Sequence, residues 1–369
     1  MEFVISSQLL NSCVTRIDGG LGNASLAMQS VKIVADGEGV SFLTNNIRIG
    51  YQAKVEDVQV AEQGSAIVHG DTLKRFVAAS SSPDIKISTS GSDFIIKDGR
   101  RKSKLTTLDS AEFNDPRTAV EYIATMPLDS VKALLGAALH TAGIDKTIFD
   151  SVYMNNKHII STDRTKATII PFENELEDPV LLTRDFVREL NKIDTTEDIT
   201  LLSDGHFITL QLAGLADSLT MSGQLIAGDY PDMINIANQT EYPNYLSIPI
   251  LEFFNELSYI SLISDNKNQL CTMTVKDDGT ITLTADADEG INVVDSVMDF
   301  DINASNMKEG DFIFKFQISN MVGMLKTILG YIESMNSEES MLKLYYETSD
   351  KPIKVTAAGV IQILVALIH

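Results

Sequence analysis

The chain has 369 residues, enough for two or three domains of ordinary size. Its 44% hydrophobic content supports real cores and excludes a disordered chain, while two distant cysteines, Cys13 and Cys271, exclude a disulfide framework and favour a reducing compartment. The net charge of −22 argues against a nucleic-acid-binding protein, because phosphates repel an acidic body, unless positive charge is gathered on one surface.

The two ends of the sequence give no sign of a secretion signal or a membrane anchor. The opening residues MEFVIS lack a basic segment followed by an apolar one, so we expect no signal peptide. The apolar stretch from Ile361 to Ile368 is interrupted by Gln362 and is far shorter than the roughly 20 residues that a membrane-spanning helix needs. We therefore expect a cytoplasmic protein.

The first third of the chain alternates between helical and strand-like patterns. A helix is expected over residues 7–17, because Leu10, Cys13 and Val14 recur at helical spacing. A second helix is expected over residues 71–80, with Asp71 as its N-cap. The strands expected in this third cover residues 31–35, 40–44, 50–55, 66–68, 85–88, 94–97 and 102–108.

The same order recurs from about residue 120. Pro127 is expected to open a helix over residues 128–142, since proline is favoured where a helix begins. Thr183 is expected to cap a second helix that extends to residue 192 and carries Phe186 and Val187 on its apolar face. The expected strands cover residues 151–154, 158–162, 167–172, 199–203, 207–213 and 218–222.

A third copy of this order starts near residue 245. Pro249 is expected to open a helix over residues 250–263, with Leu251, Phe254 and Leu257 on its apolar face. The remaining expected elements are a helix over residues 318–332 and strands over residues 342–347, 353–357 and 361–367.

The three copies are evenly spaced. Matching helical positions fall at Leu9, Asp129 and Leu251, which are 120 and 122 positions apart. A unit of about 123 residues is too long for a solenoid repeat and suits whole domains in series. The sequence therefore predicts an α+β fold of three tandem domains, over residues 1–120, 121–244 and 245–369, each with two helices backed by antiparallel sheets.

No catalytic or metal-binding motif stands out. The sequence contains no Walker A lysine motif, no HExxH and no CxxC, and Gly19-Gly20-Leu21-Gly22 lacks the spacing of a dinucleotide-binding loop and predicts a turn. The acidic cluster at Asp286 resembles the start of a calcium loop, but Val297 stands where such a loop needs its last glutamate, which favours a solvated hairpin. We therefore expect a protein without catalytic activity, metal or cofactor.

Positive charge is concentrated in the expected helices. Arg184, Arg188 and Lys192 recur every four residues and form one stripe on a helix. An open alternative is that these cations pair within the helix, three residues apart, with Asp185 and Glu189. The six helical segments together carry +2, whereas the whole chain carries −22. A fold that turns the helices towards one shared surface would make that surface tolerable to phosphate.

The threefold repeat and several short segments resemble the bacterial DNA sliding clamp, the beta subunit of DNA polymerase III. The resemblance covers the whole chain. The segments that carry it are Met1-Glu2-Phe3, the Thr162-Asp163 turn, the helix from Thr183 to Leu190, the apolar final strand, and the stretch from Gly223 to Pro231-Asp232 with Tyr230 as its aromatic residue.

The resemblance implies a head-to-tail homodimer that forms a ring of six domains around duplex DNA without sequence specificity. It also implies an ATP-driven clamp loader and a replicative DNA polymerase as partners. The cations expected to face DNA are Arg16, Lys74, Arg75, Lys132, Arg184, Arg188, Lys192 and Lys326. The residues implied for a partner-peptide cleft between the second and third domains are Phe149, Thr162, Arg164, Lys166, Val365, Ala366, Leu367 and Ile368. The implied dimer interface brings Leu105 of one subunit against Leu262 and Ile263 of the other.

Several positions depart from the family pattern. Where the family reads Thr-Asp-Gly-His-Arg-Leu, this chain reads Thr-Asp-Arg-Thr-Lys-Ala from Thr162 to Ala167. The usual C-terminal Met-Pro-Met-Arg-Leu is replaced by the residues from Val365 to His369, and the proline after the Pro-Asp turn by Asn238. We therefore expect a cleft with an altered peptide preference. The family's early-loop arginine falls near Asn23, so that DNA contact is expected to be lost.

Two other functions stay open. One is an enzyme whose site carries no recognisable motif, which hydrolysis or transfer activity in the purified protein would reveal. The other is a clamp-like interaction module that binds partner peptides but no longer encircles DNA. Its best support is the helix over residues 250–263, which carries Glu252 and Glu256 and no basic residue. The oligomeric state discriminates between this module and a ring.

Overall fold

The structure is a computed structural model that describes residues 1–109, 112–145, 147–195, 197–213, 217–239, 242–264, 269–287, 292–307 and 310–365. The chain divides into two compact units. Unit 1 comprises Met1–Leu128 and Arg188–Ile226, and unit 2 comprises Asp129–Val187 and Ala227–His369. None of the described helices is both long enough and apolar enough to span a membrane.

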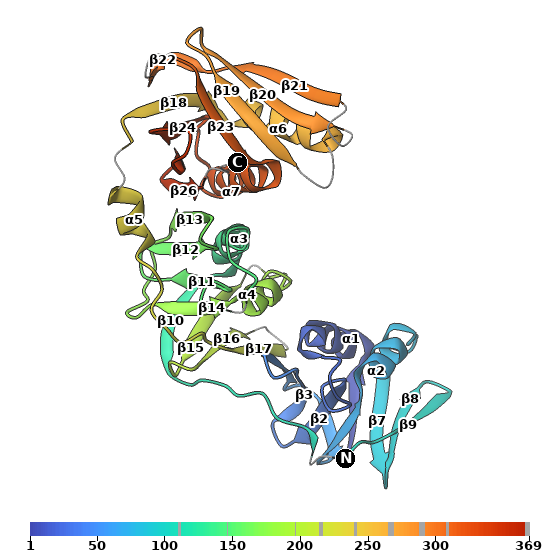
Figure 1. Ribbon diagram of the computed structural model, residues 1–369. Helices are drawn as coiled ribbons and strands as arrows, with labels where there is room; N and C mark the ends of the chain where they lie inside the picture. The colour runs from blue at the N-terminus through green and yellow to red at the C-terminus, as the bar shows by residue number, and fades with distance from the viewer. Residues whose placement is uncertain are drawn as a thin grey trace. The chain divides into compact units, whose positions relative to one another are not determined.

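One order of elements occurs three times along the chain: a strand, a helix, three strands, and then a further strand, helix and three strands (Figure 1). The first occurrence consists of β1 (Glu2–Ser6), α1 (Ser7–Arg16), β2 (Ser30–Asp36), β3 (Gly39–Asn45), β4 (Ile49–Val55), β6 (Gly64–His69), α2 (Gly70–Ala78), β7 (Asp84–Ser90), β8 (Asp93–Asp98) and β9 (Arg101–Thr106). The 3-10 turn η1 (Asp18–Gly20) and the short strand β5 (Gln59–Glu62) are additions to this order.

The second and third occurrences keep the same order. The second consists of β10 (Tyr122–Pro127), α3 (Leu128–Ala138), β11 (Ser151–Met154), β12 (His158–Thr162), β13 (Lys166–Pro171), β14 (Val180–Thr183), α4 (Arg184–Leu190), β15 (Asp198–Ser203), β16 (Phe207–Ala213) and β17 (Asp217–Gln224). The third consists of β18 (Asn244–Pro249), α6 (Ile250–Ile263), β19 (Leu270–Val275), β20 (Thr280–Ala287), β21 (Asn292–Asp299), β23 (Phe312–Gln317), α7 (Ile318–Ser334), β24 (Met341–Tyr346), β25 (Ile353–Ala357) and β26 (Val360–Leu364), with α5 (Met233–Gln239) before it and β22 (Asp301–Asn306) within it.

The strands form two antiparallel sheets in each unit. Unit 1 contains a five-stranded sheet, in the order β5-β1-β7-β8-β9, and an eight-stranded sheet, in the order β10-β15-β16-β17-β4-β3-β2-β6. Unit 2 contains a nine-stranded sheet, in the order β14-β11-β12-β13-β26-β25-β24-β18-β22, and a four-stranded sheet, in the order β21-β20-β19-β23. The fold is therefore α+β, as the sequence predicts.

The helices pack in pairs against these sheets. In unit 1, α1 contacts α2, and in unit 2, α6 contacts α7 (Figure 1). The expected helix starts are confirmed where a side chain caps the helix: Ser6 Oγ accepts a hydrogen bond from the backbone amide of Leu9 (3.2 Å), and Thr183 Oγ1 accepts one from the amide of Phe186 (3.2 Å). α3 and α6 begin immediately after Pro127 and Pro249.

Two details differ from the sequence-based expectation. Asp71 is not the N-cap of α2; the cap position is His69, and Asp71 lies in the first helical turn. The apolar face of α6 is formed by Phe253, Leu257 and Ile260, whereas Leu251 is 61% exposed. The helix is apolar on almost every side, so the pattern alone did not select the face that packs inward.

The acidic cluster at Asp286 lies in a hairpin, as expected. β20 and β21 pair in antiparallel register from Thr280 opposite Asp299 to Ala287 opposite Asn292. Residues 288–291 of the cluster lie outside the described part of the chain. Among the described residues, no three His, Cys, Asp or Glu side chains are placed together so that they could hold a metal ion.

Candidate functional site

A patch of apolar side chains lies on one face of the nine-stranded sheet, beside α5. Ile160, Ile169 and Ile361 stand opposite one another across β12, β13 and β26. Met233 and Ala237 of α5 pack on Ile160 and Ile169 and are buried there. Five half-buried side chains border this buried cluster, namely Tyr153, Tyr230, Ile234, Ile361 and Ile363. We call these five side chains the apolar patch.

Three aromatic rings line one side of the apolar patch, and we call them the aromatic strip. The ring of Tyr230 stacks on Tyr153 (centroids 5.4 Å apart) and lies 6.3 Å from the ring of Phe149. The backbone amide of Thr162 donates a hydrogen bond to Tyr230 Oη (2.9 Å), which fixes the ring against β12. Burial raises the pKa of Tyr230 well above its ordinary value, so the hydroxyl stays neutral.

The turn between β12 and β13 is held by its own side chains. Asp163 Oδ1 accepts hydrogen bonds from the backbone amides of Thr165 (2.9 Å) and Lys166 (2.9 Å), and Thr162 Oγ1 accepts one from the amide of Arg164 (3.1 Å). Burial alone would raise the pKa of Asp163, but hydrogen bonds from the side chains of Thr165 and Lys166, together with those from their backbone amides, outweigh burial and hold the pKa below its ordinary value. Arg164 has a φ of +77°, a conformation that costs a residue other than glycine roughly 1–2 kcal/mol.

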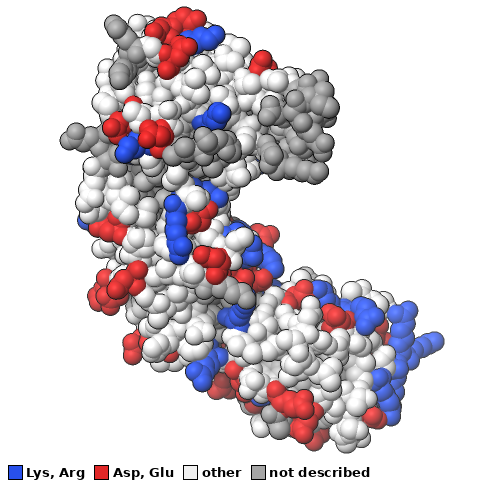
Figure 2. Space-filling view, in the orientation of Figure 1, with Lys and Arg blue, Asp and Glu red and all other residues white. Residues whose placement is uncertain are grey.

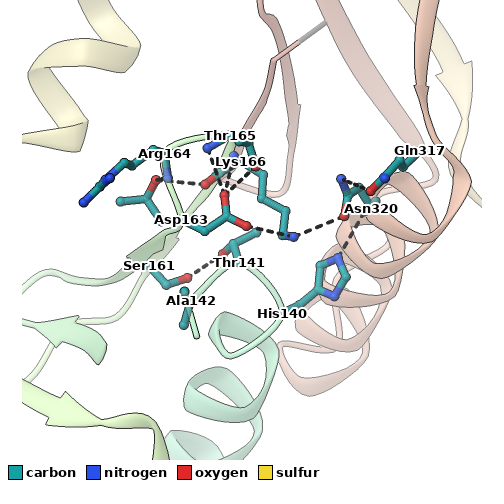
Figure 3. Close-up of polar contacts among 12 residues, drawn as sticks. His140, Thr141, Ala142, Ser161, Asp163, Arg164, Thr165, Lys166, Gln317 and Asn320 are labelled. Atoms are coloured by element: carbon teal, nitrogen blue, oxygen red, sulfur yellow. Dashed lines mark hydrogen bonds and ion pairs between the residues drawn. The ribbon is translucent and has the colours of Figure 1, made fainter. Parts of the chain in front are cut away.

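Lys166 lies on the other side of this sheet from the apolar patch. Ala167 is buried beneath α5, and successive side chains of a strand alternate, so Lys166 faces α7. Its Nζ forms an ion pair with Asp163 Oδ2 (3.0 Å) and donates to Asn320 Oδ1 (3.1 Å). His140 joins the same network through Asn320 O (3.2 Å), and burial lowers the pKa of this imidazole (Figure 3). The structure therefore brings Phe149, Thr162 and Arg164 together and directs Lys166 away from them.

The end of the described chain passes beside the same turn. The backbone amide of Val365 donates to the carbonyl of Thr165 (2.9 Å), and 40% of the Val365 side chain is exposed. The other residues expected to line the cleft, Ala366, Leu367 and Ile368, lie outside the described residues.

Most of the cations expected to face DNA are already engaged within the chain. Three form ion pairs, namely Arg16 with Asp217 (2.6 Å), Lys74 with Asp18 (2.5 Å) and Lys192 with Glu189 (2.6 Å). Lys192 thus pairs with Glu189, as in the alternative that the sequence left open, although α4 ends at Leu190 and does not extend to residue 192 as expected. Arg75, Arg188 and Lys326 are exposed, and Lys132 is half-buried. The helices consequently present a weak positive field.

Arg184 uses its guanidinium to hold the segment that follows α3, which ends at Ala138. Its Nη1 donates to the carbonyls of Ala142 (2.8 Å) and Gly143 (3.0 Å), and both of these residues are buried. Of the predicted stripe, Arg188 is exposed on α4 and Lys192 is exposed beyond the end of this helix, whereas Arg184 is half-buried.

Replacing Arg184 with leucine is expected to lower the free energy of unfolding by about 1–3 kcal/mol, because two buried carbonyls lose their donor. Arg188→Leu, at an exposed position of the same helix, is the matched control and should change the free energy of unfolding by less than about 0.5 kcal/mol. Urea denaturation followed by circular dichroism measures both values. Equal losses in the two variants would show that the contact to Ala142 and Gly143 contributes nothing.

The residues expected at a dimer interface lie at the ends of the repeats. Leu105 is half-buried on β9, opposite the buried Phe94, and β9 is a free edge of its sheet. Leu262 and Ile263, at the end of α6, are 86% and 42% exposed. Leu262 therefore lies outside the core formed by the described residues of its own repeat.

Comparisons with known proteins bear on the fold. No family model and no curated protein matches the sequence. Solved structures do: the DNA polymerase III subunit beta from Pseudomonas aeruginosa matches with a TM-score of 0.86 at 14% identity, covering 100% of both chains. The DNA polymerase sliding clamp from Bacillus subtilis has a TM-score of 0.86 at 17% identity, and a putative DNA polymerase III beta subunit from Eubacterium rectale has 0.87 at 16%; each match covers 100% of this chain and 99% of the other.

The chain has the sliding-clamp fold. Within this fold, sequence reasoning missed several residues of the apolar patch, above all Tyr153 and Ile363 and the whole of α5. A signal for α5 was present, since Asp232 is a favoured N-cap type and its Oδ1 accepts a hydrogen bond from the backbone amide of Asn235 (2.9 Å). Tyr230 was noted as the aromatic residue of a turn, but not as the ring that connects Tyr153 with Phe149.

Proposed function

We propose that the protein is a DNA sliding clamp, a processivity factor that has no catalytic activity, encircles duplex DNA and tethers the replicative DNA polymerase. The three repeats then correspond to three domains, over residues 1–120, 121–244 and 245–369. The cytoplasm is the compartment that suits this role, and an ATP-driven clamp loader is the partner that would open the ring. The observation that carries the proposal is the way in which the repeats join.

Neighbouring repeats join through antiparallel pairs of equivalent strands. β4 of the first repeat pairs with β17 of the second, from Val55 opposite Asp217 to Ile49 opposite Gly223. β13 of the second repeat pairs with β26 of the third. The equivalent strands that remain are β21 of the third repeat and β9 of the first, and each is a free edge of its sheet. A second copy placed head to tail would pair both edges and close a ring of six domains.

The chemistry of the two free edges supports this pairing. β9 carries the exposed cations Lys102 and Lys104, part of a run of Lys and Arg side chains along the β8–β9 hairpin, although Lys104 also pairs with Asp93 of β8 (2.7 Å) (Figure 2). β21 carries the exposed carboxylates of Asp295 and Asp299. Leu105 lies on the other side of β9, where the exposed apolar end of α6 from another copy would cover it. Unpaired edges of this kind invite pairing with another chain unless they are protected.

DNA would be held by the closed ring rather than by tight contacts. A surface binder needs several Lys or Arg contacts to phosphate, and its affinity then falls steeply as salt rises. Here the net charge is −22, and Arg16, Lys74 and Lys192 are already paired with carboxylates. Weak contacts at exposed cations, such as Arg188 and Lys326, would centre the duplex and permit sliding.

The test of encirclement depends on DNA ends. After loading onto a nicked circular plasmid, the protein is expected to remain bound in about 0.5 M salt, where phosphate contacts are screened over only a few ångströms. Cutting that plasmid once should release it, because a ring slides off an end. Arg188→Ala combined with Lys326→Ala should slow loading and leave retention on the circle unchanged. Gel filtration of the DNA with labelled protein measures the bound fraction.

Two results would contradict the proposal. If salt strips the protein equally from circular and linear DNA, the protein is a surface binder. If the protein never remains on circular DNA and has the mass of a monomer, a peptide-binding module that no longer encircles DNA is the better description.

A further inference from the structure

Two turns of the chain share one strained backbone conformation but carry different side chains. Arg164, between β12 and β13, and Ile47, between β3 and β4, both have a φ of +77°. In each turn the residue two positions earlier accepts a hydrogen bond from the strained amide, through Thr162 Oγ1 (3.1 Å) or Asn45 Oδ1 (2.9 Å). The side chain of the residue just before the strained one, Asn46 or Asp163, accepts hydrogen bonds from the backbone amides of the two residues that follow the strained one. The two turns are therefore equivalent positions of successive repeats.

Glycine would adopt this backbone conformation without strain, so the side chain at each position needs an explanation of its own. The side chain of Ile47 is 65% exposed. The guanidinium of Arg164, by contrast, lies over the ring of Phe149, with Cζ 4.5 Å from the ring centroid. The side chain leaves the turn in the direction away from Lys166 and His140 (Figure 3). Arg164 thus places a cation at the end of the aromatic strip.

The charge of Arg164 is not neutralised by the described part of the chain. Lys166, two residues later, is paired with Asp163 and largely buried, whereas Arg164 is exposed and forms no ion pair with a carboxylate of a described residue. The hydroxyl of Thr147, which donates to Asp145 Oδ1 (2.7 Å), holds the pKa of Asp145 below its ordinary value, and the charge of Arg164 lowers that pKa to a smaller extent. A guanidinium stacked on a ring keeps its N–H groups at its edge, where they match the two oxygens of a carboxylate.

The surroundings define the rest of the ligand. Next to Phe149 the aromatic strip continues through Tyr230 to Tyr153, and Ile361 and Ile363 border it. These half-buried apolar surfaces accept apolar side chains of an extended peptide and offer nothing to a polar one. On a chain with a net charge of −22, an exposed cation at the end of the aromatic strip favours a carboxylate at that end of the site.

We propose that Arg164 determines the specificity of the partner site by binding a carboxylate of an apolar partner peptide, while the aromatic strip binds the peptide's apolar side chains. This inference rests on the proposed function, because it assumes that partners dock on the apolar patch. The carboxylate is either an Asp or Glu side chain or the free C-terminus of the peptide; both offer the same pair of oxygens to Arg164.

The test compares peptides selected by the full-length protein with those selected by three variants. Libraries of random octapeptides, displayed either with free C-termini or within a loop, are panned on the wild type and on Arg164→Gly, Arg164→Lys and Ile47→Gly. Ile47→Gly is the matched control, because it relieves the same backbone strain at the equivalent turn of the first repeat. Thermal unfolding of each variant verifies that the fold is intact.

The wild type and Ile47→Gly are expected to enrich apolar peptides with one acidic group, which lies in the side chain or at the C-terminus according to the library. Arg164→Gly should lose that preference and still enrich apolar peptides. For the best synthetic peptide, Arg164→Gly should weaken binding in fluorescence anisotropy by about five- to tenfold, and replacing Asp by Asn or amidating the C-terminus should weaken wild-type binding equally. The affinity of Arg164→Lys for this peptide should lie between those of the wild type and Arg164→Gly, because lysine keeps the positive charge but lacks the paired N–H groups of arginine.

Three outcomes separate the possible failures. If Arg164→Gly retains the acidic preference, Arg164 does not determine specificity, although the partner site stands. If the wild type enriches no apolar peptides, the partner site itself is wrong, and the inference falls with it. If a single-stranded oligonucleotide binds in an Arg164-dependent manner and displaces the peptides, the ligand is a phosphate chain, and the peptide assignment is overturned.

Discussion

Replacing Leu262 and Ile263 together with aspartate is expected to produce folded monomers. Both side chains are exposed at the end of α6 and lie outside the core formed by the described residues, so the fold should tolerate the change. At the proposed interface each would bury an apolar side chain and contribute about 1.5–3 kcal/mol to association. The two new carboxylates would also add negative charge to α6, which packs against β21 with its exposed Asp295 and Asp299. Light scattering after gel filtration at micromolar concentration measures the mass.

Leu251→Asp is the control for this experiment. Leu251 lies at the beginning of the same helix and is 61% exposed, so it tests the effect of an aspartate on α6 away from the proposed interface. This variant should remain a dimer. A dimeric double variant would show that the subunits join elsewhere, and a monomeric control would show that a charge anywhere on α6 disturbs assembly.

Deleting residues 365–369 is expected to abolish stimulation of the replicative polymerase while leaving the dimer intact. β26 ends at Leu364, so the nine-stranded sheet keeps its strands. The deletion removes the segment that begins at Val365, where the chain is bonded to Thr165 in the turn that carries Arg164. Primer extension on a long single-primed template measures stimulation, which should fall at least tenfold, the equivalent of about 1.4 kcal/mol of partner binding.

Val120→Ser provides the comparison for that deletion, because this exposed apolar residue lies in unit 1, far along the chain from the apolar patch. It should stimulate the polymerase as the wild type does. Unchanged stimulation by the deleted protein would remove the C-terminal segment from the partner site. Loss of the dimer in light scattering would mean that the segment supports the fold instead.

The repeat and most of its helices were predictable because local signals agree with tertiary packing. Thr183 caps α4 as its residue type suggests, and Pro127 and Pro249 directly precede helices. α5 was missed because a helix of seven residues is too short to show a clear period, and its packing on the sheet stabilises it. The face of α6 was assigned wrongly because nearly all of its sides are apolar, so contacts distant in sequence select the buried one.

The candidate site was predictable in its residues but not in their directions. The sequence identified the turn from Thr162 to Lys166, yet whether a residue of β13 lies under α5 or faces α7 depends on strand register, which the pattern did not determine. Ion pairs were likewise predictable only where both residues are close in the sequence. The pair of Lys192 and Glu189 is three residues apart and could be considered from sequence, whereas Arg16 and Asp217 meet only because β17 pairs with β4.

Pairing between free strand edges has a consequence for a cell that contains a second protein of this fold. The hydrogen bonds of a strand ladder join backbone to backbone and do not distinguish one sequence from another. If the ladder alone decided, subunits of the two proteins would mix into hybrid rings. The cations of β9 and the carboxylates of β21 attract each other in self-assembly and would repel a foreign edge of like sign. The charges on these two strands would thus favour rings that contain two copies of the same protein over hybrid rings.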